Sequence, residues 1–236
     1  MNVDVAFAPE EVNNLEITEK SILIVDILRA TSTITTAIAN GSAFIIPVNT
    51  PKEAFDLYKE YDGNTILGGE VDGKRVNGFH LGNSLSEYTE SVVKDNQIIF
   101  RTTNGTKAIN AFISSKNLVI GSFLNQTAVC NHLLKLGNDI LIVCSGKEGR
   151  FGMEDAVFAG ACVSSFGENI SKTDSAVAVE ILYQAFKTDI LQMLRDSEHG
   201  RYLINIGLED DLYLCSQVDI TTVIPIYEDG KIIRYS

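Results

Sequence analysis

Acidic and basic side chains follow an apolar run near the start of this 236-residue chain, at the point where the run ends. Asp26 and Arg29 come directly after Ser21–Val25. A carboxylate at such a position can ligate Mg²⁺ or accept a phosphoryl group as a nucleophile, and an arginine can hold an anion in a bidentate fork. The structural alternative is that Asp26 caps the following helix and Arg29 neutralises it.

A second apolar run, Gln97–Phe100, leads into a short segment of small polar residues. The hydroxyls and backbone amides of Thr103, Asn104, Gly105 and Thr106 are predicted to surround a phosphate or carboxylate, since glycine lets the backbone approach closely. The segment does not have the Walker A pattern of P-loop proteins. An ordinary capped turn is the alternative.

A third run, Asp139–Cys144, leads into Ser145 and Gly146, and then into a helical pattern that begins with Glu154 and Asp155. Adjacent carboxylates in a first helical turn suit the positive end of the helix dipole, which is the structural interpretation. They also suit a hard cation, which takes oxygen ligands and usually keeps several waters.

Two further segments carry candidate side chains. The glycine-rich stretch from Gly68 to about Glu87 contains Glu70 and ends near Asn83 and Ser84. So long an irregular segment in a compact domain predicts an ordered active-site loop. His199 lies in a later loop and is a candidate general acid or anion contact.

Apolar runs and helical patterns alternate along the whole chain, which predicts an α/β fold with three α/β/α layers around a largely parallel or mixed sheet. We expect one domain over residues 1–236, with two lobes meeting near residue 120 as the alternative. The predicted strands are Val3–Phe7, Ser21–Val25, Ala43–Val48, Thr65–Leu67, Ile98–Phe100, Asn117–Ile120 and Ile140–Cys144, with a C-terminal hairpin of Thr221–Tyr227 and Lys231–Tyr235. The predicted helices are Thr33–Asn40, Pro51 to about Tyr61, Gly105–Ser114, Asn125–Leu136, Glu154–Phe166, Thr173 to about Arg195 and Arg201–Ile206.

The three strand–turn–helix junctions are expected to form one binding site. In an open α/β sheet such junctions lie at the carboxyl edge, where ligands bind. Helix N-termini there present free N–H groups to an anion. The pattern therefore favours an enzyme or binding protein for a small anionic molecule, with a phosphate as the first choice.

Composition limits the partners. The chain has 19 Lys and Arg against 31 Asp and Glu, a net charge of −12, which predicts no nucleic-acid partner. No apolar stretch approaches the roughly 18 residues of a membrane helix, and the N-terminus lacks a signal-peptide pattern. We therefore expect a cytoplasmic protein without a membrane partner, for which a small homo-oligomer is a reasonable state. The cysteines form no C-x-x-C pair and are expected to be reduced and mostly buried: Cys130, Cys144, Cys162 and Cys215.

Taken together and in order, these motifs resemble the 2-phosphosulfolactate phosphatase family. The resemblance covers about residues 3–225 and depends on the order of the pieces, since each alone is weak. Two positions differ from the family pattern: His80 stands where an acidic residue is common, and Leu85 where proline often follows Asn-Ser. The pieces are Val25–Thr33, Gly69-Glu70, Gly78–Ser84, Thr103–Thr106, Glu154-Asp155 with Ala159-Gly160, and Ser197–Arg201.

The resemblance implies a Mg²⁺-dependent acid phosphatase with an α/β fold that converts 2-phospho-3-sulfolactate to 3-sulfolactate and phosphate, a step toward coenzyme M. We expect Asp26, Arg29 and His199 to be catalytic, with Asp26 as nucleophile or, alternatively, a metal-bound water in that role. A phosphatase or lyase for another phosphorylated 2-hydroxy acid and a non-catalytic anion-binding protein remain the other functions to be weighed. The expected Mg²⁺ ligands are Asp26, Glu70, Glu154 and Asp155, and the expected substrate contacts are Asn83, Ser84, Thr103, Asn104, Gly105, Thr106, Ser145 and Gly146.

Overall fold

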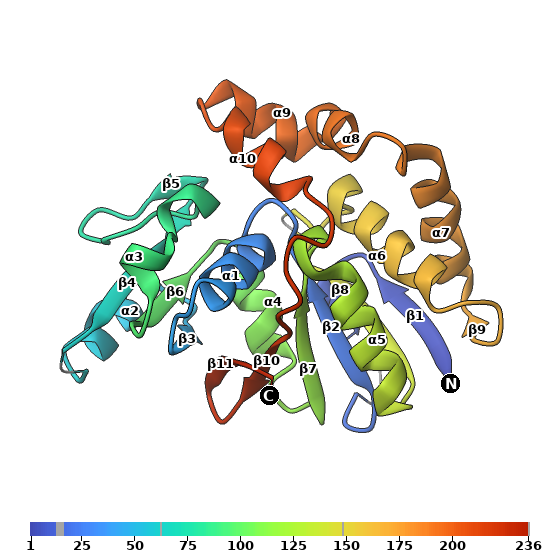
Figure 1. Cartoon of the computed structure of the whole chain (residues 1–236), viewed down its shortest axis with the longest axis horizontal. Coiled ribbons are helices and arrows are strands. Elements are labelled where there is room, and N and C mark those ends of the chain that lie inside the picture. The colour runs from blue at the N-terminus through green and yellow to red at the C-terminus, as the bar shows by residue number, and fades with distance from the viewer. Residues whose placement is uncertain (13–16, 62, 148, 236) are drawn as a thin grey trace.

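The computed structural model describes residues 1–12, 17–61, 63–147 and 149–235. It shows an α/β protein with one large mixed sheet flanked by helices, which confirms the predicted class (Figure 1). The strands are β1 (Asn2–Ala6), β2 (Ser21–Val25), β3 (Phe44–Pro47), β4 (Thr65–Val71), β5 (Lys74–Arg75), β6 (Gln97–Arg101), β7 (Asn117–Gly121), β8 (Ile140–Cys144), β9 (Ser171–Lys172), β10 (Pro225–Glu228) and β11 (Lys231–Arg234). The helices are α1 (Ala30–Ala39), α2 (Pro51–Tyr58), α3 (Glu90–Val93), α4 (Gly105–Ala111), α5 (Gln126–Leu136), α6 (Met153–Ser165), α7 (Asp174–Phe186), α8 (Ile190–Asp196), α9 (Glu198–Asn205) and α10 (Glu209–Cys215).

The strand order places two of the three junctions side by side. The order is β5-β4-β6-β3-β11-β10-β7-β2-β8-β1-β9, and β2 pairs in parallel with both β7 and β8. The junctions after β2 and β8 are therefore neighbours. The third junction, after β6, lies in the other half of the sheet, where β6 pairs in parallel with β3 and β4.

The C-terminal hairpin lies in the middle of the sheet rather than at its edge. Strand β10 pairs antiparallel with β7, and β11 pairs antiparallel with β3. The predicted hairpin is thus confirmed. Its position between the two halves also explains why the sheet is mixed.

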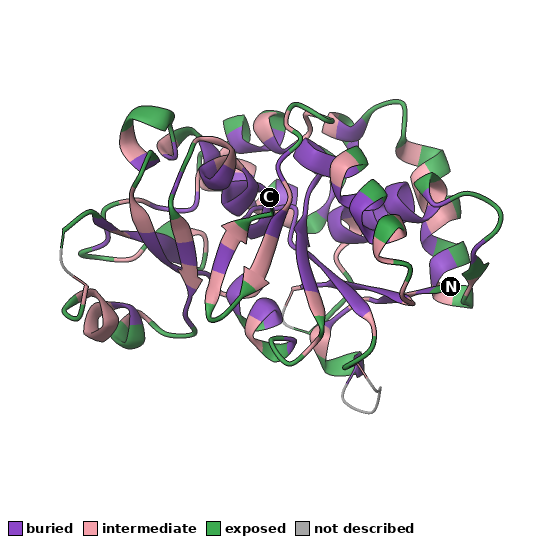
Figure 2. Ribbon diagram, turned by 60° about the horizontal axis from the view of Figure 1, so that its bottom comes forward, coloured by how far each residue is buried: buried purple, intermediate pink, exposed green. Residues whose placement is uncertain are grey.

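The central strands are buried on both faces, as their unbroken apolar sequence predicts (Figure 2). Successive side chains of a strand point to opposite faces. Ile22 and Ile24 accordingly belong to a core cluster with α1 and α4, whereas Leu23 and Val25 belong to one with α5, α6 and α7. All four cysteines are free and buried, as predicted.

Two element predictions were wrong. The long helix expected from Thr173 to about Arg195 is divided into α7 and α8, because the Asp189 side chain caps a new helix by accepting a hydrogen bond from Gln192 N at 2.9 Å. The segment expected to be irregular from Gly68 begins instead as the second half of β4. A side chain at Gly69 would lie 1.8 Å from the Arg101 carbonyl oxygen, so this glycine marks a close approach to β6 rather than a loop.

Helices α8, α9 and α10 pack on one another and form what we call the C-terminal arm, residues 190–215 (Figure 1). Helix α10 also contacts the short helical turn Leu85–Glu87 from the other half of the chain. Helix α10 itself was not predicted. Among the described residues, no helix combines the length and apolarity needed to span a bilayer.

Candidate active site

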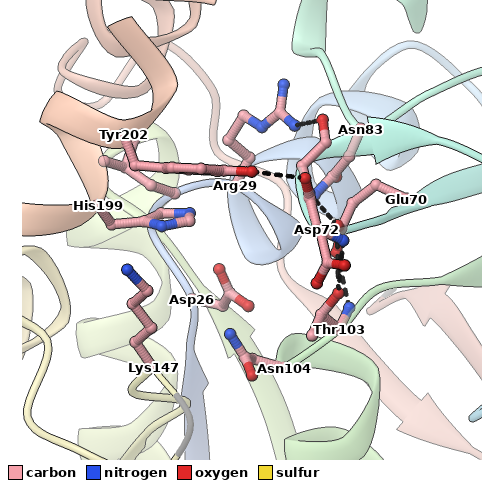
Figure 3. Close-up of a pocket in the computed structure, with 12 residues that line it drawn as sticks. Asp26, Arg29, Glu70, Asp72, Asn83, Thr103, Asn104, Lys147, His199 and Tyr202 are labelled. Atoms are coloured by element: carbon pink, nitrogen blue, oxygen red, sulfur yellow. Dashed lines mark hydrogen bonds between the residues drawn. The ribbon is translucent and has the colours of Figure 1, made fainter. Parts of the chain in front are cut away.

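The three junctions converge on one cavity of about 260 Å³ (Figure 3). Asp26 comes from the end of β2, Thr103 and Asn104 from the turn after β6, and Lys147 from the loop after β8. Arm residue His199 also lines the cavity. The convergence follows from α4, which begins after β6 and packs back against β2 and α1.

Asp26 lies on the floor of the cavity and is 7% exposed. Its Oδ1 accepts a hydrogen bond from Ala30 N at 3.2 Å, so it does contact the start of α1, as the capping alternative supposed. Burial raises the pKa of Asp26 from 3.8 to about 7, and the nearby carboxylates of Glu70 and Glu154 add to the rise. Near neutral pH this carboxyl group is therefore poised between its two protonation states.

Gly105 lets α4 come directly against Asp26. A side chain there would lie 2.4 Å from Ala30 Cβ and 2.7 Å from Asp26 Oδ2. This glycine thus serves close packing between α4 and α1. Thr106 lies behind it and exchanges hydrogen bonds with Thr102, with its hydroxyl donating to the Thr102 carbonyl at 2.9 Å.

A carboxylate of the protein itself occupies the predicted anion-binding turn. Glu70 Oε1 accepts a hydrogen bond from Thr103 N at 2.6 Å, and Oε2 accepts one from the Thr103 hydroxyl at 3.2 Å. Oε2 also accepts from Gly73 N at 2.6 Å, in the turn between β4 and β5. Glu70 therefore joins two turns that line the cavity.

Asp155 joins the other two junctions in a similar way. Its Oδ1 accepts a hydrogen bond from Ile27 N at 2.8 Å, and its Oδ2 accepts from the Ser145 hydroxyl and Gly146 N, both at 3.2 Å. Burial raises the pKa of Asp155 well above its ordinary value, with the charges of Asp26 and Glu154 adding to it. Burial also raises the pKa of Glu154. A small extension of the cavity is lined by Asp26, Ser145, Gly146, Glu154 and Asp155 among others.

The Arg29 guanidinium is turned away from Asp26 (Figure 3). Its Nη1 lies 2.5 Å from Asp211 Oδ2, and its Nη2 donates to the Gly73 carbonyl at 3.0 Å. The arginine is 3% exposed and lines both the main cavity and a second one beside it. The peptide bond between Leu28 and Arg29 is cis.

His199 stacks on Tyr202 at one wall, with ring centroids 5.9 Å apart and planes inclined by 19°. Burial lowers the pKa of His199 to about 4, and the positive charges of Lys147 and Arg29 contribute. Lys147 Nζ lies 5.6 Å from the Tyr202 ring centre and donates to Glu198 Oε1 at 3.0 Å. Figure 3 shows Lys147 and His199 on the side of the cavity opposite Glu70.

The chain is similar to known proteins over nearly its whole length. The family described as 2-phosphosulpholactate phosphatase matches residues 6–230. The chain belongs to the 2-phosphosulfolactate phosphatase family. A Clostridium acetobutylicum protein named "Probable 2-phosphosulfolactate phosphatase" is 36% identical over 99% of this chain and 100% of its own length. A protein of the same name from Clostridium botulinum strain Eklund 17B is 37% identical over 99% of this chain and 100% of its own length. Another, from Symbiobacterium thermophilum, is 35% identical over 92% of this chain and 95% of its own length.

Membership in this phosphatase family confirms the resemblance read from the sequence. The predicted residues divide into groups by position. Asp26, Arg29, Glu70, Asn83, Thr103, Asn104 and His199 line the main cavity; Ser145, Gly146, Glu154 and Asp155 line its small extension; Ser84 lines the second cavity beside Arg29; Gly105 and Thr106 are buried behind Asp26.

The sequence reasoning missed Asp211 and Tyr202. Asp211 lies in the acidic run Glu209-Asp210-Asp211, which has the composition of a solvated helix start, yet it is only 2% exposed. Tyr202 was included in a short predicted helix, and its hydroxyl donates to the Asp72 carbonyl at 2.8 Å. Both come from the C-terminal arm, so their contribution depends on how the arm packs.

The expected metal ligands are close enough to influence one another's pKa, but they do not form a closed cage. Among the described residues no group of three or more His, Cys, Asp or Glu side chains is placed to hold a metal ion. Mg²⁺ is usually held by one or two carboxylates together with waters and substrate phosphate oxygens, so it does not need such a group. Asp26 and Glu154, two buried carboxyl groups that line the same small extension of the cavity, are the candidates for such binding.

Proposed function

We propose that this chain hydrolyses 2-phospho-3-sulfolactate to 3-sulfolactate and inorganic phosphate with the help of Mg²⁺. The observation that carries the proposal is the buried Asp26 carboxyl group on the floor of a cavity where all three junctions meet. Family membership supports the choice of substrate. In the cell this product belongs to the coenzyme M route that the family resemblance implies.

The size of the cavity supports a small substrate. Its volume of about 260 Å³ lies just below the roughly 300–1,000 Å³ of pockets for drug-sized ligands. A three-carbon ester that carries phosphate, sulfonate and carboxylate groups is a ligand of that size. Asn83, Asn104 and Lys147 supply polar or cationic groups to it from three different segments.

The charge of the cavity supports a cation. Arg29 and Lys147 are the basic side chains of its lining, whereas Asp26, Glu70 and Asp72 are acidic. A highly anionic substrate would be repelled by such a site unless a positive ion reduced the negative charge. Asp26 and Glu154 are the residues we propose to hold it, because Asp155 and Glu70 already accept hydrogen bonds on both of their oxygens. Bound Mg²⁺ would polarise the phosphate and stabilise the negative charge that develops on its oxygens.

Asp26 is our choice of nucleophile. Its carboxylate would attack phosphorus, the bond from phosphorus to the C2 oxygen of the substrate would break, and the leaving oxygen would take a proton as 3-sulfolactate departs. Water would then cleave the aspartyl phosphate and release inorganic phosphate. The alternative is direct attack by a water molecule, in which case Asp26 would only hold the cation.

His199 is the candidate for contact with the leaving group or another anionic oxygen. With a pKa near 4 its ring is neutral at neutral pH and can donate one N–H. The negative charge of a bound ester would raise that pKa, which is the condition for His199 to act as a general acid.

A phosphate-release assay tests the proposal. The wild-type chain is incubated with 2-phospho-3-sulfolactate and with 2-phospholactate, with Mg²⁺ or with EDTA. We expect release that prefers the sulfonated ester and stops in EDTA. Release from neither ester would contradict phosphatase activity, whereas release that persists in EDTA would contradict the role of the metal.

Two variants test the role of Asp26. Asp26→Asn keeps the shape of the side chain but removes the nucleophile, so we expect turnover to fall by at least about 10³-fold, as it does when a covalent nucleophile is removed. Asp95→Asn, at an exposed aspartate in another part of the chain, is the matched control and should keep wild-type turnover. Near-normal turnover in Asp26→Asn would show that the nucleophile is another group.

A further inference from the structure

Arg29 is held in place by an aspartate that lies 182 residues further along the chain. Arg29 Nη1 and Asp211 Oδ2 are 2.5 Å apart, and each side chain is 3% exposed. The guanidinium is therefore fixed from the side opposite Asp26, by a partner on the C-terminal arm. The arginine still lines the main cavity.

The same carboxylate holds a second segment. Asp211 Oδ1 accepts a hydrogen bond from the Ser84 hydroxyl at 2.5 Å, so its two oxygens bind two different parts of the molecule. Ser84 follows Asn83, which lines the main cavity and is 5% exposed. Asp211 thus fixes Arg29 and the residue next to Asn83 at the same time.

A second contact ties the same arm to the turn between β4 and β5. The Tyr202 hydroxyl donates to the Asp72 carbonyl at 2.8 Å, and Arg29 Nη2 donates to the next carbonyl, that of Gly73, at 3.0 Å. Figure 3 shows both contacts reaching this turn from the same side. The turn also supplies Gly73 N to Glu70, so its position affects the opposite wall of the cavity.

We propose that Asp211 is a positioning residue of this active site, which acts on substrate binding through Arg29. A guanidinium has five N–H donors, and the bonds to Asp211 and Gly73 leave others for an anionic group of the substrate. Holding the guanidinium in advance reduces the freedom that substrate must otherwise remove on binding. The inference rests on the proposed function for its substrate, but anion binding can test it separately.

The test is a double-mutant cycle with Asp211→Asn, Arg29→Met and the two combined. Asp211→Asn keeps the shape of the side chain and removes its charge, and Arg29→Met keeps much of the bulk of the arginine. The exposed neighbour in the same helical turn supplies the matched control, Asp210→Asn. For each variant, kcat and KM for 2-phospho-3-sulfolactate and the dissociation constant of inorganic phosphate are measured.

We expect Asp211→Asn to raise KM and the dissociation constant of phosphate by about tenfold, with a smaller change in kcat, because it weakens binding rather than the chemical step. The double variant should be no worse than Arg29→Met alone, since Asp211 acts through Arg29. Asp210→Asn should match wild type. Wild-type binding in Asp211→Asn would overturn the proposal, as would effects of the two single changes that multiply in the double variant.

Two further measurements keep the test decisive. If Asp211→Asn fails to fold, Ser84→Ala removes one of the two bonds of Asp211 and leaves the ion pair, and it should raise KM by a smaller factor in the same direction. An unchanged KM in Ser84→Ala would then overturn the proposal. If the wild type cleaves no ester, the proposed function fails, and the dissociation constants of phosphate still decide the role of Asp211.

Discussion

The carboxylate of Asp155 accepts a hydrogen bond from the backbone N–H of Ile27 at 2.8 Å, directly beside Asp26. A residue at the start of α6 thereby fixes the backbone at the end of β2. With its other oxygen Asp155 holds Ser145 and Gly146 at the end of β8. This one side chain joins two of the three turns from which the cavity is built.

Removing that carboxylate should destabilise the protein. Asp155→Ala leaves three buried donors without their acceptor, so we expect a loss of about 2–4 kcal/mol in the free energy of unfolding. Urea denaturation measures it. The control is Asp174→Ala, which removes an exposed acid from the first turn of α7 and should cost only about 0.3–1 kcal/mol. Equal losses in the two variants would show that Asp155 serves only the helix dipole.

Stability without metal should depend on pH through Asp26. The folded chain keeps this proton up to about pH 7, whereas an unfolded aspartate loses it near pH 3.8, so ionisation of Asp26 lowers stability as pH rises through that window. His199 acts in the opposite direction, since its lowered pKa of about 4 favours the folded state as pH rises from 4 to 6.5. Comparison with a variant is therefore needed to isolate Asp26.

That variant is Asp26→Asn, compared with wild type by thermal unfolding in EDTA between pH 4.5 and 7.5. The stability of Asp26→Asn relative to wild type should rise with pH across this range by roughly 3 kcal/mol, because most of the shift in the pKa of Asp26 falls within it. If the difference in stability between Asp26→Asn and wild type were the same at every pH, the pKa of Asp26 would not be raised in the folded chain.

Mg²⁺ should offset the loss of stability that ionisation of Asp26 causes. At pH 7.5 we expect the ion to raise the melting temperature of the wild type, with a gain of about 2.7 kcal/mol when its concentration is 100 times the dissociation constant. The gain should disappear in Asp26→Asn and shrink in Glu154→Gln. Glu168→Gln, at an exposed glutamate beyond the end of α6, should keep it. A gain of equal size in all four proteins would place the bound ion elsewhere.

Gly105 should not tolerate a side chain. Gly105→Ala would place a methyl group 2.4 Å from Ala30 Cβ and 2.7 Å from Asp26 Oδ2, so α4 must move away from α1. We expect a loss of about 1–3 kcal/mol in stability, together with reduced turnover because Asp26 is displaced. Lys107→Ala, at an exposed position of the same helix, should change stability by less than about 0.5 kcal/mol. Wild-type stability and turnover in Gly105→Ala would contradict the packing role.

The part of the site built on strand ends was predictable. Asp26 and Ser145 each follow an apolar run, and β2 pairs in parallel with β8, so the approach of these two residues follows from the pattern. Thr103 comes from the half of the sheet that runs in the opposite direction, and the packing of α4 against β2 and α1 brings it to the cavity. The sequence pattern did not show which nearby donors already form hydrogen bonds within the protein. Glu70 occupies the turn at Thr103, and only the course of β4 beside β6 brings it there.

The part built on the C-terminal arm was not predictable. Asp211 stands in an acidic run that is typical of an exposed helix start, and its burial arises from packing of α10 on the turn Leu85–Glu87. The division between α7 and α8 was missed for a related reason. Apolar spacing continues through Asp189, and only the capping hydrogen bond of that residue reveals a second helix.

The hairpin β10–β11 has a consequence for how the molecule acquires its fold. Among the described residues, the segment 225–234 links β3 and β7 within the sheet, and it is synthesised after the other described strands. Until then each half of the sheet carries an open edge with unpaired backbone groups, the kind of surface on which chains associate. Pairing across so many residues is also slow. Pairing of β10 with β7 and of β11 with β3 thus covers both open edges with a single hairpin.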